Sequence, residues 1–107
     1  MFNYFYKLEG KTPVRCQSTG EWDQWLRTAK YGVRAHRFKT DNEWIEVITI
    51  FTGIDFDVFY KYKKPLLFET RIIGGEWDGR TLRCSTWEQA EKQHEDALQL
   101  LFSVTVP

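Results

Sequence analysis

Apolar residues recur along the chain with two different periods, which predict strands and helices in turn. Alternating or aromatic-rich segments predict strands over 2–8, 12–16, 33–39, 43–52, 66–73 and 81–84. Trp22, Trp25, Leu26 and Ala29 lie at helical spacing and predict a helix over 19–30. A longer helical stripe runs from Trp87 to Phe102, and the tail 103–107 is expected either to add a short edge strand or to fray.

Caps and turns mark the ends of these elements. Two capping boxes precede the predicted helices, Ser18 with Glu21 and Ser85 with Glu88. Gly32 is expected to end the first helix, and residues 40–42 are expected to join two strands into a hairpin. Residues 54–65 break the pattern and predict a long connection.

The segment 43–52 is apolar on both of its faces. One side carries Trp44, Ile48 and Ile50, and the other carries Ile45, Val47 and Phe51. Apolar residues on both faces are typical of a central strand that is covered on both sides.

Two segments of the chain follow the same order of residue types. Residues 9–19 and 78–86 each begin with an acidic residue, Gly, a basic residue and Thr. Each segment then contains Arg-Cys and, further on, Ser-Thr, and each precedes a predicted helix that carries Trp. Either an internal duplication or convergence on the same turn and cap chemistry explains the match. We predict a single α+β domain over 1–107, with five to six antiparallel strands and two helices packed on the sheet.

Composition and charge narrow the class of protein. The 107 residues are 42% hydrophobic, and 15 basic side chains balance 15 acidic ones. Zero net charge argues against a nucleic-acid clamp or a polybasic membrane anchor, and it allows self-association into a homo-oligomer. No apolar run approaches the ~20 residues of a membrane span, and no signal-peptide core is present. A cytoplasmic protein is expected.

Cysteine and histidine offer little chemistry by spacing alone. No two of Cys16, Cys84, His36 and His94 have metal-ligand spacing, so neither a metal nor a cofactor is predicted. Each Cys ends a predicted strand just before a helix, where the helix dipole can lower a thiol pKa. The alternative is a buried apolar filler.

The strand 33–39 is the most basic stretch of the chain. It could hold a phosphate or an acidic partner, or it could be a solvated strand face. The candidate residues are Arg34, His36, Arg37 and Lys39.

The connection 54–65 is unusually aromatic for a loop and is the predicted partner-binding segment. Aromatic anchors beside basic residues are typical of protein interfaces. The alternative is a loop that tucks its rings under the sheet. The candidate residues are Phe56, Phe59, Tyr60, Lys61, Tyr62, Lys63 and Lys64.

Four phrases of the chain resemble a group of small uncharacterised proteins encoded by bacteriophages and prophages. They are YKLEGKTPV, WIEVITIFTGID, PLLFETRIIGG and CSTWEQAEKQHEDA, and the likeness spans about 6–97. The resemblance implies a phage accessory protein in the host cytoplasm that binds a host or viral protein, such as a component of an antiviral defence. It implies no catalytic or binding residues.

Three hypotheses follow from these observations. The first is a non-enzymatic protein that binds and inhibits a host protein. The second is a binding protein that sequesters a small molecule, such as a nucleotide signal, with aromatic rings on the base and basic side chains on phosphate. The third is a small enzyme that uses Cys84 or His94.

Overall fold

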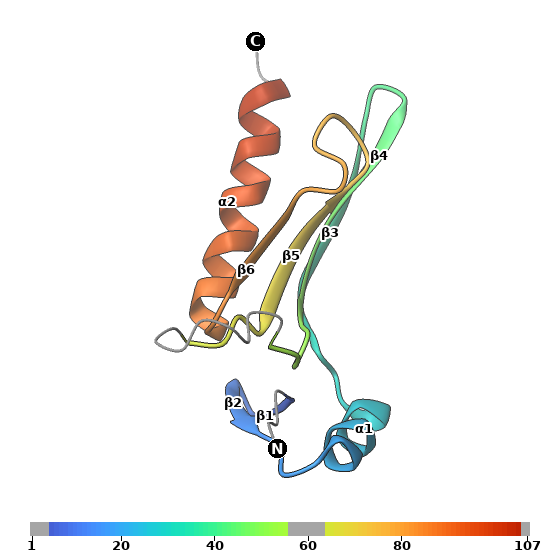
Figure 1. Cartoon of the computed structure of the whole chain (residues 1–107). Helices are drawn as coiled ribbons and strands as arrows, with labels where there is room; N and C mark the ends of the chain where they lie inside the picture. The colour runs from blue at the N-terminus through green and yellow to red at the C-terminus, as the bar shows by residue number, and fades with distance from the viewer. Residues whose placement is uncertain (1–4, 56–63, 106–107) are drawn as a thin grey trace.

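The structure, a computed structural model, describes residues 5–55 and 64–105. Its elements in chain order are β1 (Tyr6–Glu9), β2 (Thr12–Arg15), α1 (Thr19–Thr28), β3 (Gly32–Thr40), β4 (Glu43–Phe51), β5 (Phe68–Ile73), β6 (Thr81–Cys84) and α2 (Trp87–Thr105) (Figure 1). Helices and strands alternate much as the sequence predicts. No helix in the described part of the chain is long and apolar enough to cross a membrane.

The strands form two antiparallel sheets. Among the described strands β1 pairs with β2 alone, and the larger sheet has the order β3-β4-β5-β6. The α+β class is therefore confirmed, but the prediction of a single sheet of five to six strands is wrong. The small hairpin binds the chain that leaves β4, because Tyr6 donates its backbone N–H to Gly53 (2.7 Å) and Phe5 bridges to Ile54. It therefore lies beyond the end of the larger sheet.

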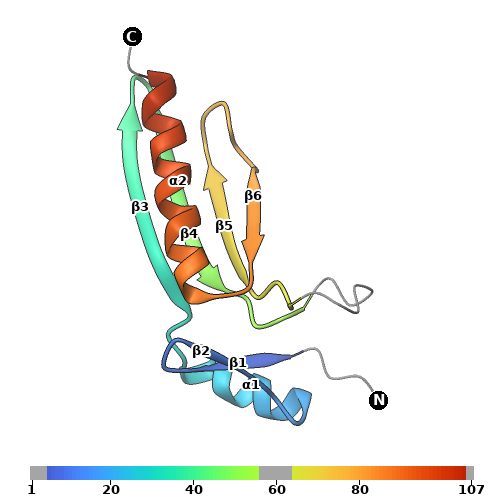
Figure 2. The same cartoon turned by 90° about the vertical axis from the view of Figure 1, so that its left-hand side faces the viewer.

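Helix α2 covers one face of the four-stranded sheet and contacts all four strands (Figures 1 and 2). The predicted apolar stripe is confirmed where it meets the sheet, since its inner positions are buried. These are Ala90, His94, Ala97, Leu98 and Leu101. Each buried Leu contributes about 1.5–3 kcal/mol relative to an exposed one, so this interface holds much of the stability of the fold.

The helix ends differ in detail from the predicted caps. Ser18 caps α1 as expected, accepting the N–H of Glu21 (3.1 Å). The box at α2 lies one residue later than predicted, because Thr86 accepts the N–H of Gln89 (3.1 Å) and the Gln89 side chain accepts the N–H of Thr86. Gly32 begins β3 rather than capping α1, and α2 extends through Thr105 in place of an edge strand.

Helix α1 does not pack flat on the four-stranded sheet, so the prediction of two helices on one sheet is also wrong. It lies at the end of the sheet beside β1 and β2 (Figure 1), and none of its residues is buried. Only Trp25 reaches the core, where its ring stands edge-on to Phe51 with centroids 5.7 Å apart. Tyr6 and Leu8 of β1 join the same apolar cluster. Both matched segments of the sequence fold as a hairpin followed by a helix, yet the two helices pack in different ways.

The far face of the four-stranded sheet has no described element packed on it (Figures 1 and 2). The shortest extent of the molecule is 20 Å, the thickness of one helix layer on one sheet. The prediction that β4 is covered on both sides is thus wrong for the part of the chain that the structure describes. The apolar residues on its outer side, Trp44 above all, remain accessible to solvent.

The turn between β5 and β6 depends on glycine. Gly74 has a φ of +92°, and a Cβ there would collide with the carbonyl oxygen of Trp44. Gly79 has a φ of +87° in the same turn, but a Cβ there would meet nothing within 4 Å.

We expect Gly74→Ala to lower the free energy of unfolding clearly more than Gly79→Ala. The Gly79 change costs only the strain of a left-handed backbone, about 1–2 kcal/mol. The Gly74 change adds a collision with backbone, about 1–3 kcal/mol more. Urea unfolding of the two variants measures the difference, and equal losses would contradict the packing described for Gly74.

Candidate functional site

The uncovered face of the four-stranded sheet, here called the open face, gathers the outward side chains of β3 to β6. Alternation along the strands places them opposite the residues that contact α2, and the strand register sets them side by side. Five are apolar: Ala35, Trp44, Ile48, Ile50 and Ile73. Seven are polar: Arg37, Lys39, Glu46, Glu69, Arg71, Thr81 and Arg83.

Trp44 is the most exposed large apolar residue of the open face. It is 53% exposed, and nearby Ile73 is 40% exposed. The guanidinium of Arg37 lies 4.4 Å from the centroid of the Trp44 ring, a cation–π contact that holds the indole in place. A fixed aromatic side chain with a partly exposed ring loses little entropy when a partner covers it.

A carboxylate between two guanidinium groups orders the other end of the open face. Glu69 lies 3.4 Å from Arg71 and 3.3 Å from Arg83, measured between the charged nitrogen and oxygen atoms. The Glu69 side chain is only 12% exposed, whereas Arg71 and Arg83 are 54% and 41% exposed. The two cations are thus positioned by one partly buried anion.

The open face carries an excess of positive charge. Its polar residues include four cations and two carboxylates. The solvent side of α2, on the opposite side of the molecule, carries mostly acidic residues: Glu88, Glu91, Glu95 and Asp96, with Lys92. The chain therefore has zero net charge overall but two surfaces of opposite sign.

A chain of hydrogen bonds crosses the interface between α2 and the sheet. His36 Nδ1 lies 2.8 Å from His94 Nε2, and His94 Nδ1 lies 2.8 Å from the hydroxyl oxygen of Thr49. The hydroxyl oxygens of Thr49 and Thr70 are 2.7 Å apart. Thr49, Thr70 and His94 are fully buried, whereas the His36 residue is exposed. We call these four residues the histidine relay.

Burial keeps the inner histidine of the relay neutral. Loss of solvation lowers the pKa of His94 to about 4, and the positive charges of His36 and Arg34 act in the same direction. A neutral imidazole has one donor and one acceptor nitrogen, so His94 can satisfy one histidine and one threonine. Each ring nitrogen of the buried His94 therefore has a hydrogen-bond partner within the relay.

The four predicted phosphate-binding residues do not converge on one site. Arg34 and His36 face α2, and Arg34 forms an ion pair with Glu95 (2.7 Å). Arg37 and Lys39 belong to the open face, as alternation along β3 requires. Among the described residues, no single cluster brings the four side chains together.

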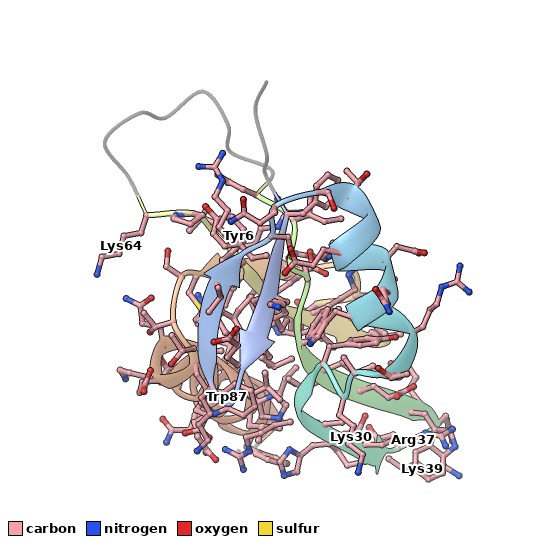
Figure 3. The ribbon with its side chains drawn as sticks, turned by 90° about the horizontal axis from the view of Figure 1, so that it is seen from below. Tyr6, Lys30, Arg37, Lys39, Lys64 and Trp87 are labelled. Atoms are coloured by element: carbon pink, nitrogen blue, oxygen red, sulfur yellow. The ribbon has the colours of Figure 1, made fainter. Side chains whose placement is uncertain are left out.

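The predicted partner-binding loop lies mostly outside the described residues. Phe56, Phe59, Tyr60, Lys61, Tyr62 and Lys63 all fall in 56–63, so their prediction stays open. Lys64 is described and exposed, and its carbonyl oxygen accepts a hydrogen bond from Ser85 (3.4 Å). In Figure 3, Lys64 lies across the molecule from Arg37 and Lys39.

The cysteines and metal-binding side chains offer no assembled centre among the described residues. Cys16 and Cys84 are both buried with free thiols. Burial raises the pKa of Cys84 to about 11 and also raises the pKa of Cys16, and a protonated thiol is a poor nucleophile. Within 5–55 and 64–105, no three His, Cys, Asp or Glu residues group closely enough to hold a metal ion.

Sequence reasoning missed both the open face and the histidine relay. The double apolar pattern of 43–52 pointed to the open face, but it predicted a covering layer instead of an exposed surface. The relay joins residues 58 and 45 positions apart, and no local pattern could pair them. The position of His94 on the helical stripe was the available signal.

We expect the relay to make the protein sensitive to acid. In the unfolded chain His94 takes up a proton near its ordinary pKa of 6.5, whereas in the fold it does so only near pH 4. The free energy of unfolding should therefore fall by up to about 3 kcal/mol as the pH drops from 6.5 to 4, and be unaffected by His94 above that range.

Chemical unfolding across this pH range measures the effect. His94→Gln should flatten the slope, whereas His36→Gln should keep most of it because His94 stays buried. A slope that is unchanged in His94→Gln would show that other groups cause the acid sensitivity.

Comparison with known proteins adds no family to this description. No protein-family model, curated protein or solved structure matches the chain. The resemblance to phage proteins thus stays a prediction.

Proposed function

We propose that this chain is a non-enzymatic binding protein that docks on another protein through the open face of its sheet. The observation that supports the proposal is that the four-stranded sheet has large apolar residues on both faces. Among the described elements, α2 packs on one of these faces and nothing packs on the other. Trp44, Ile48 and Ile73 supply the apolar centre of such an interface, and the cations around them supply its rim. This arrangement matches the general anatomy of protein interfaces, with an apolar centre and a polar edge.

The charge of the open face favours one kind of partner. Two copies of the chain placed face to face would bring four cations against four cations, with only two carboxylates on each side. Like charges that are brought together in this way cost free energy. An acidic surface with apolar residues at its centre is the complementary partner. In line with the sequence resemblance, we propose a host or viral protein as that partner, and inhibition of a host defence protein as the outcome.

We expect Trp44→Ala to weaken binding of that partner by at least about 30-fold. Buried aromatic anchors at interfaces commonly cost 2 kcal/mol or more when they are truncated. Leu82→Ala is the matched control, since Leu82 is 39% exposed but lies on the other side of the sheet. The control should stay within about twofold of the unchanged protein.

The measurement has two steps. Tagged protein first captures the partner from nuclease-treated host lysate, and the affinity of the purified pair is then measured for each variant by titration. Equal affinities of Trp44→Ala and the unchanged protein would overturn the open face as the docking surface.

A cavity between β6 and α2 favours a second candidate function, the capture of a small polar molecule. Its volume is about 400 Å³, within the range of ligand pockets. Ser85, Lys92 and Asp96 line it, and Lys92 lies 3.4 Å from Asp96. The side-chain oxygen of Gln93 in its wall is buried with no hydrogen-bond partner among the described residues, so it suits a ligand that donates a hydrogen bond.

Native mass spectrometry of gently purified protein tests this second function. A bound molecule should appear as extra mass that denaturation removes, and Lys92→Ala should reduce its occupancy. Glu88→Ala, on the exposed side of the same helix, is the control. Protein that carries no extra mass would count against the small-molecule function.

A further inference from the structure

The outer edge of β3 is an unpaired strand edge. β3 stands first in the order β3-β4-β5-β6, and no described strand lies beyond it (Figure 2). It is nine residues long, whereas β6 at the other edge has four. An edge of this length presents backbone donors and acceptors that another strand can pair with.

The charges on β3 restrict which strand can pair there. Arg34, Arg37 and Lys39 are residues of the kind that keep sheet edges apart, because a basic strand repels another basic strand. An antiparallel copy of the same strand avoids this repulsion in one register, with residue 36 opposite residue 36. The pairs in that register are Arg37 with Ala35 and Arg34 with Phe38.

Other registers place cations opposite each other or shorten the paired stretch. Each register is named here by the residue through which the two-fold axis between the two copies passes. An axis at Arg37 sets two guanidinium groups opposite each other, and an axis at residue 38 sets Arg37 opposite Lys39. An axis at Arg34 also opposes two guanidinium groups. An axis at residue 35 sets Arg34 against His36 and leaves the last two residues of β3 unpaired. The register centred on residue 36 pairs residues 34–38 of each copy without opposing two cations. The bulge between Gly32 and Arg34 lies just outside this stretch.

We propose that two copies of this chain pair through their β3 edges, antiparallel and about a two-fold axis at His36. Directly opposed residues point to the same face of a sheet. Both α2 helices therefore lie on one side, and the two open faces form one continuous surface on the other side. The dimer surface differs from the proposed docking surface, so either proposal can fail without the other.

Cysteine cross-linking tests the register. In His36→Cys the two new thiols face each other, with Cα atoms about 4.5–5.5 Å apart, a separation that a disulfide can span. In the control Lys39→Cys the thiols are six residues out of register, roughly 20 Å apart along the strands. Cys16 and Cys84 are buried and can stay in place. Mild oxidation should give a covalent dimer from His36→Cys and none from Lys39→Cys or the unchanged protein.

Light scattering tests the pairing itself. At pH 8 the mass of the unchanged protein should be twice the 12.8 kDa of the chain. A monomer at the highest soluble concentration would overturn the pairing. A dimer that does not cross-link through residue 36 would overturn this edge as its interface.

Discussion

The packing of α2 against one face of the four-stranded sheet is the contact on which the rest of the structure depends. It buries the apolar stripe of the helix against β4 and β5, and it encloses His94 with Thr49 and Thr70 in the middle of that interface. Apolar packing alone would allow the helix to slide along the sheet. The directional hydrogen bonds of the relay favour one position, because a buried imidazole without partners would cost free energy. A polar group inside this interface thus specifies how the two layers meet.

One helix cannot cover both sides of a sheet, and this limit explains the exposed side chains of β4. An antiparallel sheet normally has polar residues on its solvent side, but here Trp44, Ile48 and Ile73 lie among the charges. Arg37 over the indole and Glu69 between two guanidinium groups hold that surface in a defined arrangement without burying it. The proposed function follows from this partial cover, and the opposite sign of the α2 surface gives the molecule two distinct sides.

Local patterns in the sequence predicted the elements well and their assembly less well. The strands, the hairpin turn, the Ser18 cap and the stripe of α2 all follow from residue spacing over a few positions. The separation into two sheets does not, because it depends on Tyr6 and Phe5 bonding to residues 53 and 54 instead of to a strand edge. The pairing of His36 with His94 is equally non-local. Alternation along β3 places Arg34 and His36 on one face and Arg37 and Lys39 on the other.

The position of α1 divides the chain into parts of unequal local stability. Its ten residues include none that is buried, and its main attachment to the core is the side chain of Trp25. An element with so little buried apolar surface opens by local fluctuation, at a free energy below that of global unfolding. The backbone amides of α1 should then exchange with solvent deuterium long before those of α2. A protease would accordingly reach α1 while the sheet and its covering helix are still folded.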